Sequence, residues 1–591
     1  MPLCQSCQSL QLSSLKSMTA IPLPAYGKIV ESATQGCEGC RFFRDALHLH
    51  MLLSNTPSWE LDPKTSVWLS PIWRRDWVVD LSINDPTTDQ RTSTRIFQRH
   101  VESIQPRFLV SPDPCEDSCW NQIRVWMKDC ESHGCRSDGN TSLPQRLVQV
   151  PRDEGRSPRL VETAGKQGKY VALSHSWGKS KMTKLLLDNE KQWKQAMEVS
   201  TLSRNFRDAL TITRRLGFEY IWIDALCIVQ DSPKDWATES PKMAAIYRNA
   251  SLVVSATAAI DSEYGILNKR TSLCSPLLGS DNDVYFVNKT YMYDEYGTTR
   301  ESPLSILDNL PLNNRGWAAQ ERIMARTILH YTTTEMFWEC SQGCQSESYY
   351  PWTRQSEHRG NPPDPQRLFL RNDRLQPFLR LGEPTLGCRD ADTENHSGAD
   401  AAGTLLAWFA CVSEFSHRDL TYPSDKLPAI SGLAVAIGDN LESYLAGLWS
   451  KYLARSLAWE IIAGDSRKLP AEYRAPSWSW AAANGKVLYS WEQLINHNKP
   501  HWQDKALRAH SNWPDMHGPQ FEGAQIVHDE RSNTYMTPQK GSYLTLKGNC
   551  TSVDILGDAL RANTDYFDPS VHADSMESWK IMRQREGLVC M

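Results

Sequence analysis

Cysteines near the N-terminus have the spacing of a metal site. Cys4 and Cys7 form one C-x-x-C pair, and Cys37 and Cys40 form a second. Two such pairs supply the four thiolates of a tetrahedral zinc site, although the gap between these pairs is longer than usual. Because the pattern offers no obvious open position for a water molecule, the zinc ion would be structural. The sequence predicts that all four sulfurs reach one zinc ion.

A second group of candidate metal ligands follows later in the chain. Cys130, His133 and Cys135 lie close together, and Cys115 and Cys119 precede them. Thiol and imidazole groups are zinc ligands, so this group could hold a second structural ion. The same residues could instead be thiols that lie by chance near the end of a helix. The sequence leaves both interpretations open.

Two polar segments in the middle of the chain could line a ligand site. Ser174–Gly178 ends an apolar run that begins at Tyr170, and Asp224–Asp231 ends one that begins at Phe218. In a parallel sheet the carboxyl ends of neighbouring strands lie at one edge, and ligands bind beyond that edge. We therefore expect a pocket there. The candidate ligand-binding residues of the two segments are Ser174, Trp177, Gly178, Asp224 and Gln230.

Several of these residues have structural interpretations as well. Asp224 could cap the following turn through backbone N–H groups, and Trp177 could be a core anchor. Cys227 and His175 could form a nucleophilic pair, but a cysteine within Ala-Leu-Cys-Ile is usually a small buried apolar residue. Ser174, His175 and Asp224 could be drawn as a serine triad, yet nothing resembling Gly-x-Ser-x-Gly supports it.

The surrounding sequence alternates between strand and helix patterns. Ser203 opens a helical pattern that ends before Gly217, and Ser240 with the following proline opens another. Ser251–Ala256 is a third apolar run, short enough to be a buried strand. Strands that alternate with helices predict a parallel sheet with helices on its faces. The strands at Tyr170, Tyr220 and Leu252 should be neighbours in it.

The chain is too long for a single hydrophobic core. We expect a Cys- and Trp-rich N-terminal region at residues 1–150 and an α/β core at 165–330. A polar insertion or linker should occupy 341–402, and a mixed α+β domain should occupy 403–591.

Charge and hydropathy exclude two classes of partner. The net charge is −5 and no basic block is present, so no surface for nucleic acid is expected. The longest apolar run, near Ser251–Ile260, is far shorter than the roughly 20 residues that span a membrane. The first residues lack the basic and apolar segments of a signal peptide. We therefore expect a cytoplasmic protein whose cysteines are reduced or metal-bound.

Three long segments resemble the signatures of the fungal heterokaryon-incompatibility (HET) domain. The first is Tyr170–Gly178. The second is Tyr220–Gln230, followed by Asp235, Trp236, Met243, Tyr247 and Ala250. The third is Arg315–Glu321, followed by Arg326 and Trp338–Cys340. His175 and Ser176 stand where Tyr or Cys is usual, so the first signature is altered there. Asp425–Gly432 and Pro476–Trp480 resemble segments that follow HET domains. Long motifs in the right order are far more specific than a short pattern.

HET domains are distantly similar to Toll/interleukin-receptor (TIR) domains, several of which cleave NAD+. TIR enzymes carry a catalytic Glu in a Trp-x-x-x-Glu arrangement on a helix, and Trp317 and Glu321 have that offset. The resemblance implies a TIR-like parallel sheet flanked by helices, with Glu321 as the catalytic carboxylate. It further implies that Trp317 stacks on a ring of the substrate and Arg315 pairs with a phosphate. A salt bridge from Glu321 to Arg322, Arg326 or Arg315 is the structural alternative.

The resemblance also implies a biological role. It predicts an effector that triggers programmed cell death after non-self recognition in a filamentous fungus, with NAD+ as its substrate. Its partner would be a second copy of the chain or an incompatibility partner protein. The alternatives are a non-enzymatic module that signals by self-association and a metal-stabilised scaffold.

Overall fold

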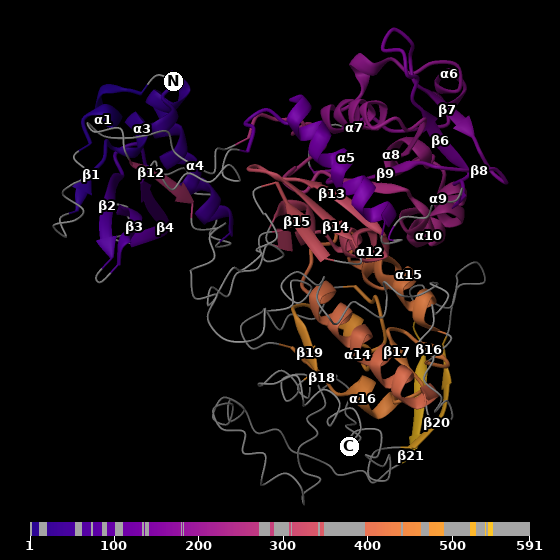
Figure 1. The fold of residues 1–591 in the computed structure, drawn as a ribbon. Helices are drawn as coiled ribbons and strands as arrows, with labels where there is room; N and C mark the ends of the chain where they lie inside the picture. Colours follow the sequence, from indigo (N-terminus) through magenta and orange to yellow (C-terminus); the bar gives the residue numbers. More distant parts are fainter. Residues whose placement is uncertain are drawn as a thin grey trace, which may run out of the picture. The chain divides into compact units, whose positions relative to one another are not determined.

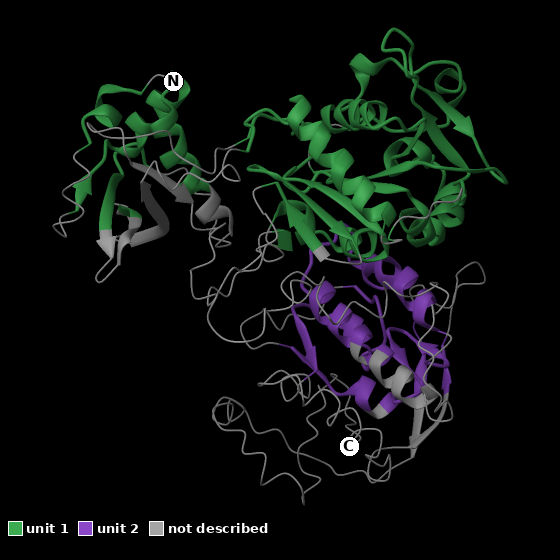
Figure 2. Ribbon diagram, viewed as in Figure 1, with its two compact units in different colours: residues 1–373 green, residues 374–591 purple. Residues whose placement is uncertain are grey.

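The computed structural model of the chain forms two compact units, residues 1–373 and 374–591 (Figure 2). The residues that it describes are 3–10, 20–53, 62–72, 75–84, 91–100, 110–132, 135, 141–178, 180, 182–270, 284–288, 307–308, 310–340, 343–347, 396–438, 441–461, 472–489, 520–526, 538, 540 and 542–547. Among them, no helix is long and apolar enough to span a bilayer.

The first unit contains an antiparallel sheet of strand order β1-β2-β3-β4-β12 with helices beside it (Figure 1). Its elements are α1 (Gln5–Gln8), β1 (Ile21–Pro22), α3 (Tyr26–Thr34), α4 (Glu38–Leu53), β2 (Ser66–Ile72), β3 (Arg75–Asn84), β4 (Arg91–His100) and β12 (Val284–Asn288). Val67 and Leu69 of β2 are buried while Trp68 between them is exposed, so one face of the strand covers a core.

The same unit contains an eight-stranded sheet of order β15-β14-β13-β11-β9-β10-β6-β7. Its strands are β6 (Arg146–Gln149), β7 (Arg159–Glu162), β9 (Val171–Ser174), β10 (Tyr220–Trp222), β11 (Leu252–Ser255), β13 (Thr327–Tyr331), β14 (Met336–Cys340) and β15 (Gly343–Ser346). A separate two-stranded ladder joins β5 (Thr141–Ser142) to β8 (Gln167–Gly168).

The predicted adjacency of three strands is confirmed. β9 lies between β10 and β11 and is parallel to both, with Val171 aligned to Ile221 on one side and to Leu252 on the other. β13 extends this parallel core beside β11. Every residue of β9 and β11 is buried, as expected for strands covered on both faces.

The predicted parallel core is extended by antiparallel strands at both edges. β14 and β15 are antiparallel on one side, and β6 and β7 are antiparallel on the other. Short connections join β13 to β14 and β6 to β7, and a short connection permits only an antiparallel pair. The fold class is therefore mixed α/β, with an eight-stranded sheet that is parallel only in its centre.

The helices in this part of the chain are α5 (Asp117–Ser132), α6 (Glu190–Trp193), α7 (Arg204–Arg215), α8 (Asp224–Cys227), α9 (Pro233–Glu239), α10 (Met243–Asn249) and α12 (Gly316–Met324). The helix predicted to begin at Ser203 is confirmed, whereas Ser240 lies in a 3-10 turn (Ser240–Lys242) and α10 begins only at Met243. Ser203 occupies the N-cap position of α7, and Gly217 adopts a left-handed φ of 81° just after that helix. The strand predicted from the apolar run at Phe218 is shorter than expected, because β10 ends at Trp222 and Asp224 already begins α8.

The second unit mixes helices with short antiparallel pairs. Its elements are α14 (His396–Ser416), α15 (Pro428–Ile437), β16 (Tyr444–Leu445), β17 (Leu448–Trp449), α16 (Leu453–Leu457), β18 (Trp459–Ile461), β19 (Val487–Tyr489), β20 (Gln520–Gln525) and β21 (Tyr543–Lys547). Two tryptophans of this unit are anchored to one backbone group. The carbonyl of Gly447 accepts hydrogen bonds from the indoles of Trp408 and Trp480 at 3.0 and 2.9 Å. Its φ of 96° and the closeness of Trp480 leave no room for a side chain.

The predicted boundaries between four regions remain predictions. β12, which lies inside the predicted 165–330 core, pairs with β4 of the N-terminal region. Within the predicted 341–402 insertion, β15 and the first turns of α14 are regular structure, and residues 348–395 lie outside the described part.

Candidate functional site

The carboxyl end of β9 lies against helix α12. Glu321 of α12 is only 5% exposed, and it accepts a hydrogen bond from the hydroxyl of Ser174, the last residue of β9. The two residues are far apart in sequence, so this contact depends on the packing of α12 against the sheet. Glu321 therefore points at the strand end where the sequence predicted it.

Tyr247 of α10 completes this group and was missed by the sequence-based site prediction. Its hydroxyl donates to the carbonyl of Leu173 at 3.1 Å and hydrogen-bonds to Glu321. The interaction with Tyr247 lowers the pKa of Glu321, so it favours the ionised carboxylate. The available signal was the position of Tyr247 within the segment that resembles the second HET signature.

Burial controls the protonation of Glu321. Removal from water raises the pKa of Glu321 to about 7, the hydrogen bond from Ser174 opposes this, and the charge of Asp224 adds to it. The guanidinium of Arg315 lowers the pKa of Glu321 by a smaller amount. A carboxyl group with a pKa near neutrality can both release and accept a proton at cellular pH.

Asp224 organises the neighbouring strand end. Its carboxylate accepts hydrogen bonds from the indole of Trp177 at 2.8 Å and from the amide of Ala225 at 2.7 Å. The Nζ atom of Lys184 lies 4.8 Å from the centre of the Trp177 ring, a cation–π contact. Asp224 thus links the segments that follow β9 and β10, and the side chain keeps 17% of its surface exposed.

His175 lies beside this group and is neutral at cellular pH. Burial lowers the pKa of His175 to about 4, although Asp224, whose carboxylate is 3.7 Å from Nδ1, raises it. The ring packs edge-on against Phe206, and the buried Nε2 atom has no hydrogen-bond partner among the described residues. A buried ring nitrogen without a partner is uncommon and indicates a place where a polar group can bind.

The other predicted ligand residues lie around these two carboxylates. Arg315 donates to the carbonyl of His175, and the Gln230 side chain donates to the carbonyls of Asp224 and Ile228 at 3.1 and 3.0 Å. Both therefore hold the backbone of the two strand-end segments. Trp317 is half-buried on α12, one turn before Glu321.

Gly178 has a clear packing role. Its φ is 61°, and an added Cβ atom would lie 2.1 Å from the Cβ atom of Asp261. Only glycine fits such a left-handed position at this close approach. Whether Gly178 also contacts a ligand stays a prediction.

The thiol of Cys227 is fully buried, and burial raises its pKa to about 12. Such a thiol carries almost no thiolate at neutral pH, so it is a poor nucleophile. This supports the interpretation of Cys227 as a small apolar core residue.

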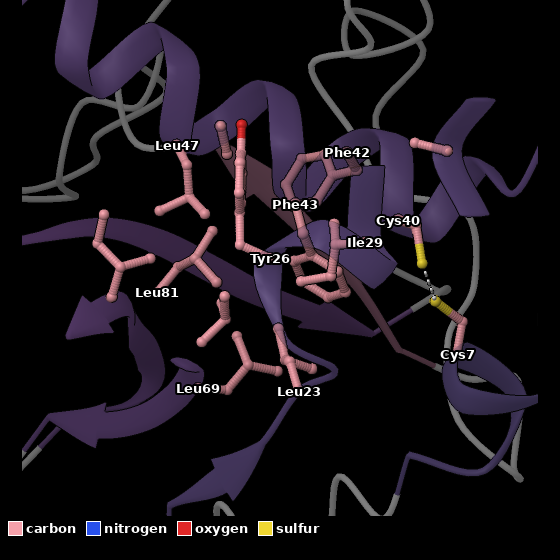
Figure 3. Close-up of a cluster of buried hydrophobic side chains, with 14 of the residues drawn as sticks. Cys7, Leu23, Tyr26, Ile29, Cys40, Phe42, Phe43, Leu47, Leu69 and Leu81 are labelled. Carbon is pink, nitrogen blue, oxygen red and sulfur yellow. Dashed lines mark hydrogen bonds between the residues drawn. The ribbon is translucent and has the colours of Figure 1, made fainter. Parts of the chain in front are cut away.

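The four N-terminal cysteines converge, as the C-x-x-C pairs predicted. Figure 3 shows two of them, Cys7 and Cys40, with their sulfurs facing each other. The Sγ atom of Cys40 lies 3.6 Å from those of Cys4 and Cys7, and the Sγ atoms of Cys7 and Cys37 are 3.7 Å apart. A tetrahedral zinc ion with bonds of about 2.3 Å places its sulfurs about 3.8 Å apart, so the arrangement fits such an ion. The amides of Cys4 and Cys40 also donate to the sulfur of Cys37 at 3.2 and 3.5 Å.

The second predicted cysteine group is only partly correct. Cys130 and Cys135 come together, but their third neighbour is Cys340. Cys119 donates instead to the carbonyl of Asp113 at 3.6 Å, and Cys115 is exposed. His133 lies outside the described residues. The partner was missed because Cys340 is distant in sequence and joins only through the packing of α5 near β14.

The fold and this site define an α/β protein whose parallel strands end at a buried acid. Residues 170–321 match the family model of the Heterokaryon incompatibility protein (HET). The chain therefore contains a HET domain at these residues, as the three motifs predicted, and a HET domain implies a role in heterokaryon incompatibility. No curated protein and no solved structure matches the chain.

Proposed function

We propose that this protein triggers programmed cell death after non-self recognition in a filamentous fungus, and that its HET domain does so by hydrolysing NAD+. The HET match supports the biological role. The activity rests on one observation: Glu321 is a buried acid with a pKa near 7 at the carboxyl end of parallel strand β9. The Trp-x-x-x-Glu offset shared with TIR enzymes supports the choice of substrate.

The reaction breaks the bond between the ribose C1′ atom and the nicotinamide nitrogen. The bonding electrons leave with nicotinamide, which becomes neutral, and positive charge develops on the ribose. Ionised Glu321 would accept hydrogen bonds from the ribose hydroxyls and stabilise that charge. Water then attacks C1′ and loses a proton, which gives ADP-ribose.

The residues around Glu321 suit the rest of a dinucleotide. Trp177 and Trp317 are half-buried aromatic side chains that can stack on a ring, and Arg315 supplies a cation for a phosphate. Because Glu321 is only 5% exposed, the substrate reaches it only if the segment around Trp177 and Gly178 moves outward. We propose that self-association, or binding of an incompatibility partner protein, causes this opening.

The test is NAD+ loss, measured by chromatography, with purified full-length protein under conditions that promote self-association. Glu321→Gln keeps the shape and removes the charge, so it should lower turnover by about 100-fold or more. Glu239→Gln is the matched control, because Glu239 is equally buried in the same domain and pairs with Lys242 at 2.7 Å. Equal turnover in wild type and Glu321→Gln would exclude the catalytic role.

The burial of Glu321 also favours a non-enzymatic rival, in which its hydrogen bonds to Ser174 and Tyr247 only hold α12 in place. The protein would then signal by self-association alone. Expression in fungal cells separates the two: Glu321→Gln should abolish cell death if hydrolysis is required and should leave it intact in the rival case.

We further propose that the N-terminal cysteines bind zinc as a structural ion. The spacing of the four sulfurs supports this. Four thiolates at this spacing would repel one another, and a cation between them would offset that repulsion. Zinc is the ion that four cysteines in tetrahedral array most commonly bind.

A further inference from the structure

Three buried thiols meet where helix α5 and strand β14 end. Cys130 lies in the last turn of α5, Cys135 follows that helix, and Cys340 is the last residue of β14. Their Sγ atoms all lie within 4.8 Å of one another. Each of the three residues is at most 4% exposed.

The surroundings of these thiols include a hydrogen-bond donor directed at sulfur. The indole of Trp338 donates to the Sγ atom of Cys130 at 3.0 Å, and Trp126 stacks on Trp338 with 6.2 Å between ring centres. An N–H group that donates to a sulfur favours the thiolate, and donors of this kind accompany metal ligands. The sulfur of Cys130 is thus oriented by the core around it.

The Sγ atoms are close enough for three thiolates to repel one another strongly. A cation between them would offset that repulsion. Each thiol would release its proton to solvent as the ion binds.

We propose that Cys130, Cys135 and Cys340 bind a thiophilic metal ion, zinc or copper(I), as three thiolates. Soft thiolate ligands select these two ions. The site is separate from the N-terminal cysteines in sequence and in the elements that carry it. Three thiolates fill three of the four positions of tetrahedral zinc, so a zinc ion would take one further ligand.

The ion would join segments that precede and follow the HET domain. Cys130 and Cys135 come before residue 170, and Cys340 comes after residue 321, so no ligand belongs to the matched segment. The bound ion would therefore fix α5 to strand β14 of the eight-stranded sheet.

The test uses full-length protein in which Cys7→Ser and Cys40→Ser remove the N-terminal cluster. After incubation with zinc sulfate or with copper(I) under reducing conditions, followed by desalting, elemental analysis should find about one equivalent of one of these metals. Further Cys130→Ser and Cys340→Ser changes should remove it. Cys411→Ser, in a buried cysteine of α14, is the control and should leave it. Absence of bound metal in the N-terminal variant overturns the proposal.

A second measurement does not depend on whether the variants fold. In unmutated protein, alkylation mapped by mass spectrometry should modify Cys130, Cys135 and Cys340 only after a chelator is added. Buried Cys344 should stay unmodified in both conditions. Equal labelling with and without chelator, or a disulfide between any two of the three cysteines, would show that no metal is held there.

Discussion

Two carboxylates in one site have different environments, and this difference defines the chemistry at the scale of residues. Asp224 is partly exposed and accepts N–H bonds from Trp177 and Ala225. Glu321 is buried and shares hydrogen bonds with the hydroxyls of Ser174 and Tyr247. Neighbouring acids in unlike environments are a common arrangement for separate acid and base roles.

The protonation of Glu321 predicts a dependence of stability on pH. Its pKa rises from 4.5 to about 7 on folding, so the native state holds a proton that the unfolded chain has released. Its contribution is complete below pH 4.5 and is lost as the pH rises through 7. Relative to Glu321→Gln, wild type should lose about 3 kcal/mol of unfolding free energy between pH 4.5 and pH 8.

His175 acts in the opposite direction, because its pKa falls from 6.5 to about 4 on folding. Its contribution is present above pH 6.5 and is lost as the pH falls through 4. The two effects overlap and partly cancel in wild type, so the comparison must be with Glu321→Gln. Urea unfolding midpoints of both proteins at pH 5 and pH 8 check it. If the urea midpoints of wild type and Glu321→Gln change equally between the two pH values, the pKa assigned to Glu321 is wrong.

At the scale of elements, the first sheet depends on the four N-terminal cysteines. Cys4 precedes α1 and Cys7 lies in it, whereas Cys40 lies in the first turn of α4. Cys7 and Cys40 are buried in one hydrophobic cluster with Phe42 and Phe43, and partly buried Cys4 packs against that cluster (Figure 3). Because short α1 cannot be stable alone, we expect the proposed metal ion to help hold it in place.

Removal of zinc should therefore loosen this part of the chain. A chelator, or Cys37→Ser, should raise hydrogen exchange in α1, α3 and α4 and leave β9 and β11 protected. The physical reason is that the binding free energy of a structural zinc ion is also folding free energy. Cys411→Ser should change neither region. Unchanged exchange in α1 after chelation would show that apolar packing alone holds the cluster.

At the scale of the whole molecule, the HET match does not coincide with a complete folding unit. β6 and β7 come before residue 170, and β13, β14 and β15 come after residue 321. β13 pairs with central strand β11, and β6 pairs with β10. A fragment of the matched residues would expose edges that these strands cover.

We expect residues 170–321 alone to aggregate and residues 110–347 to fold. Leu147, Val148, Ile328 and Leu329 are each at most 1% exposed, and full burial of such a side chain contributes roughly 1.5–3 kcal/mol. Size-exclusion chromatography and circular dichroism of both fragments check this. A soluble, folded 170–321 fragment would show that the flanking strands are dispensable.

The sequence alone determined the features that depend on neighbouring residues. Apolar runs located β9, β10 and β11, and Ser203 and Gly217 marked the ends of α7, because strand periodicity and helix capping are local effects. The C-x-x-C pairs identified the N-terminal cluster, since that spacing fixes two ligands on one turn of chain. The HET motifs were recognisable because they are long and ordered.

Only the tertiary structure decided which distant groups meet. Tyr247 reaches Glu321, Cys340 joins Cys130, and β12 pairs with β4 because helices and strands pack in three dimensions. The raised pKa of Glu321 has the same origin, since desolvation depends on everything that surrounds the carboxyl group. Such contacts join residues with no fixed separation in the chain, so no local pattern encodes them.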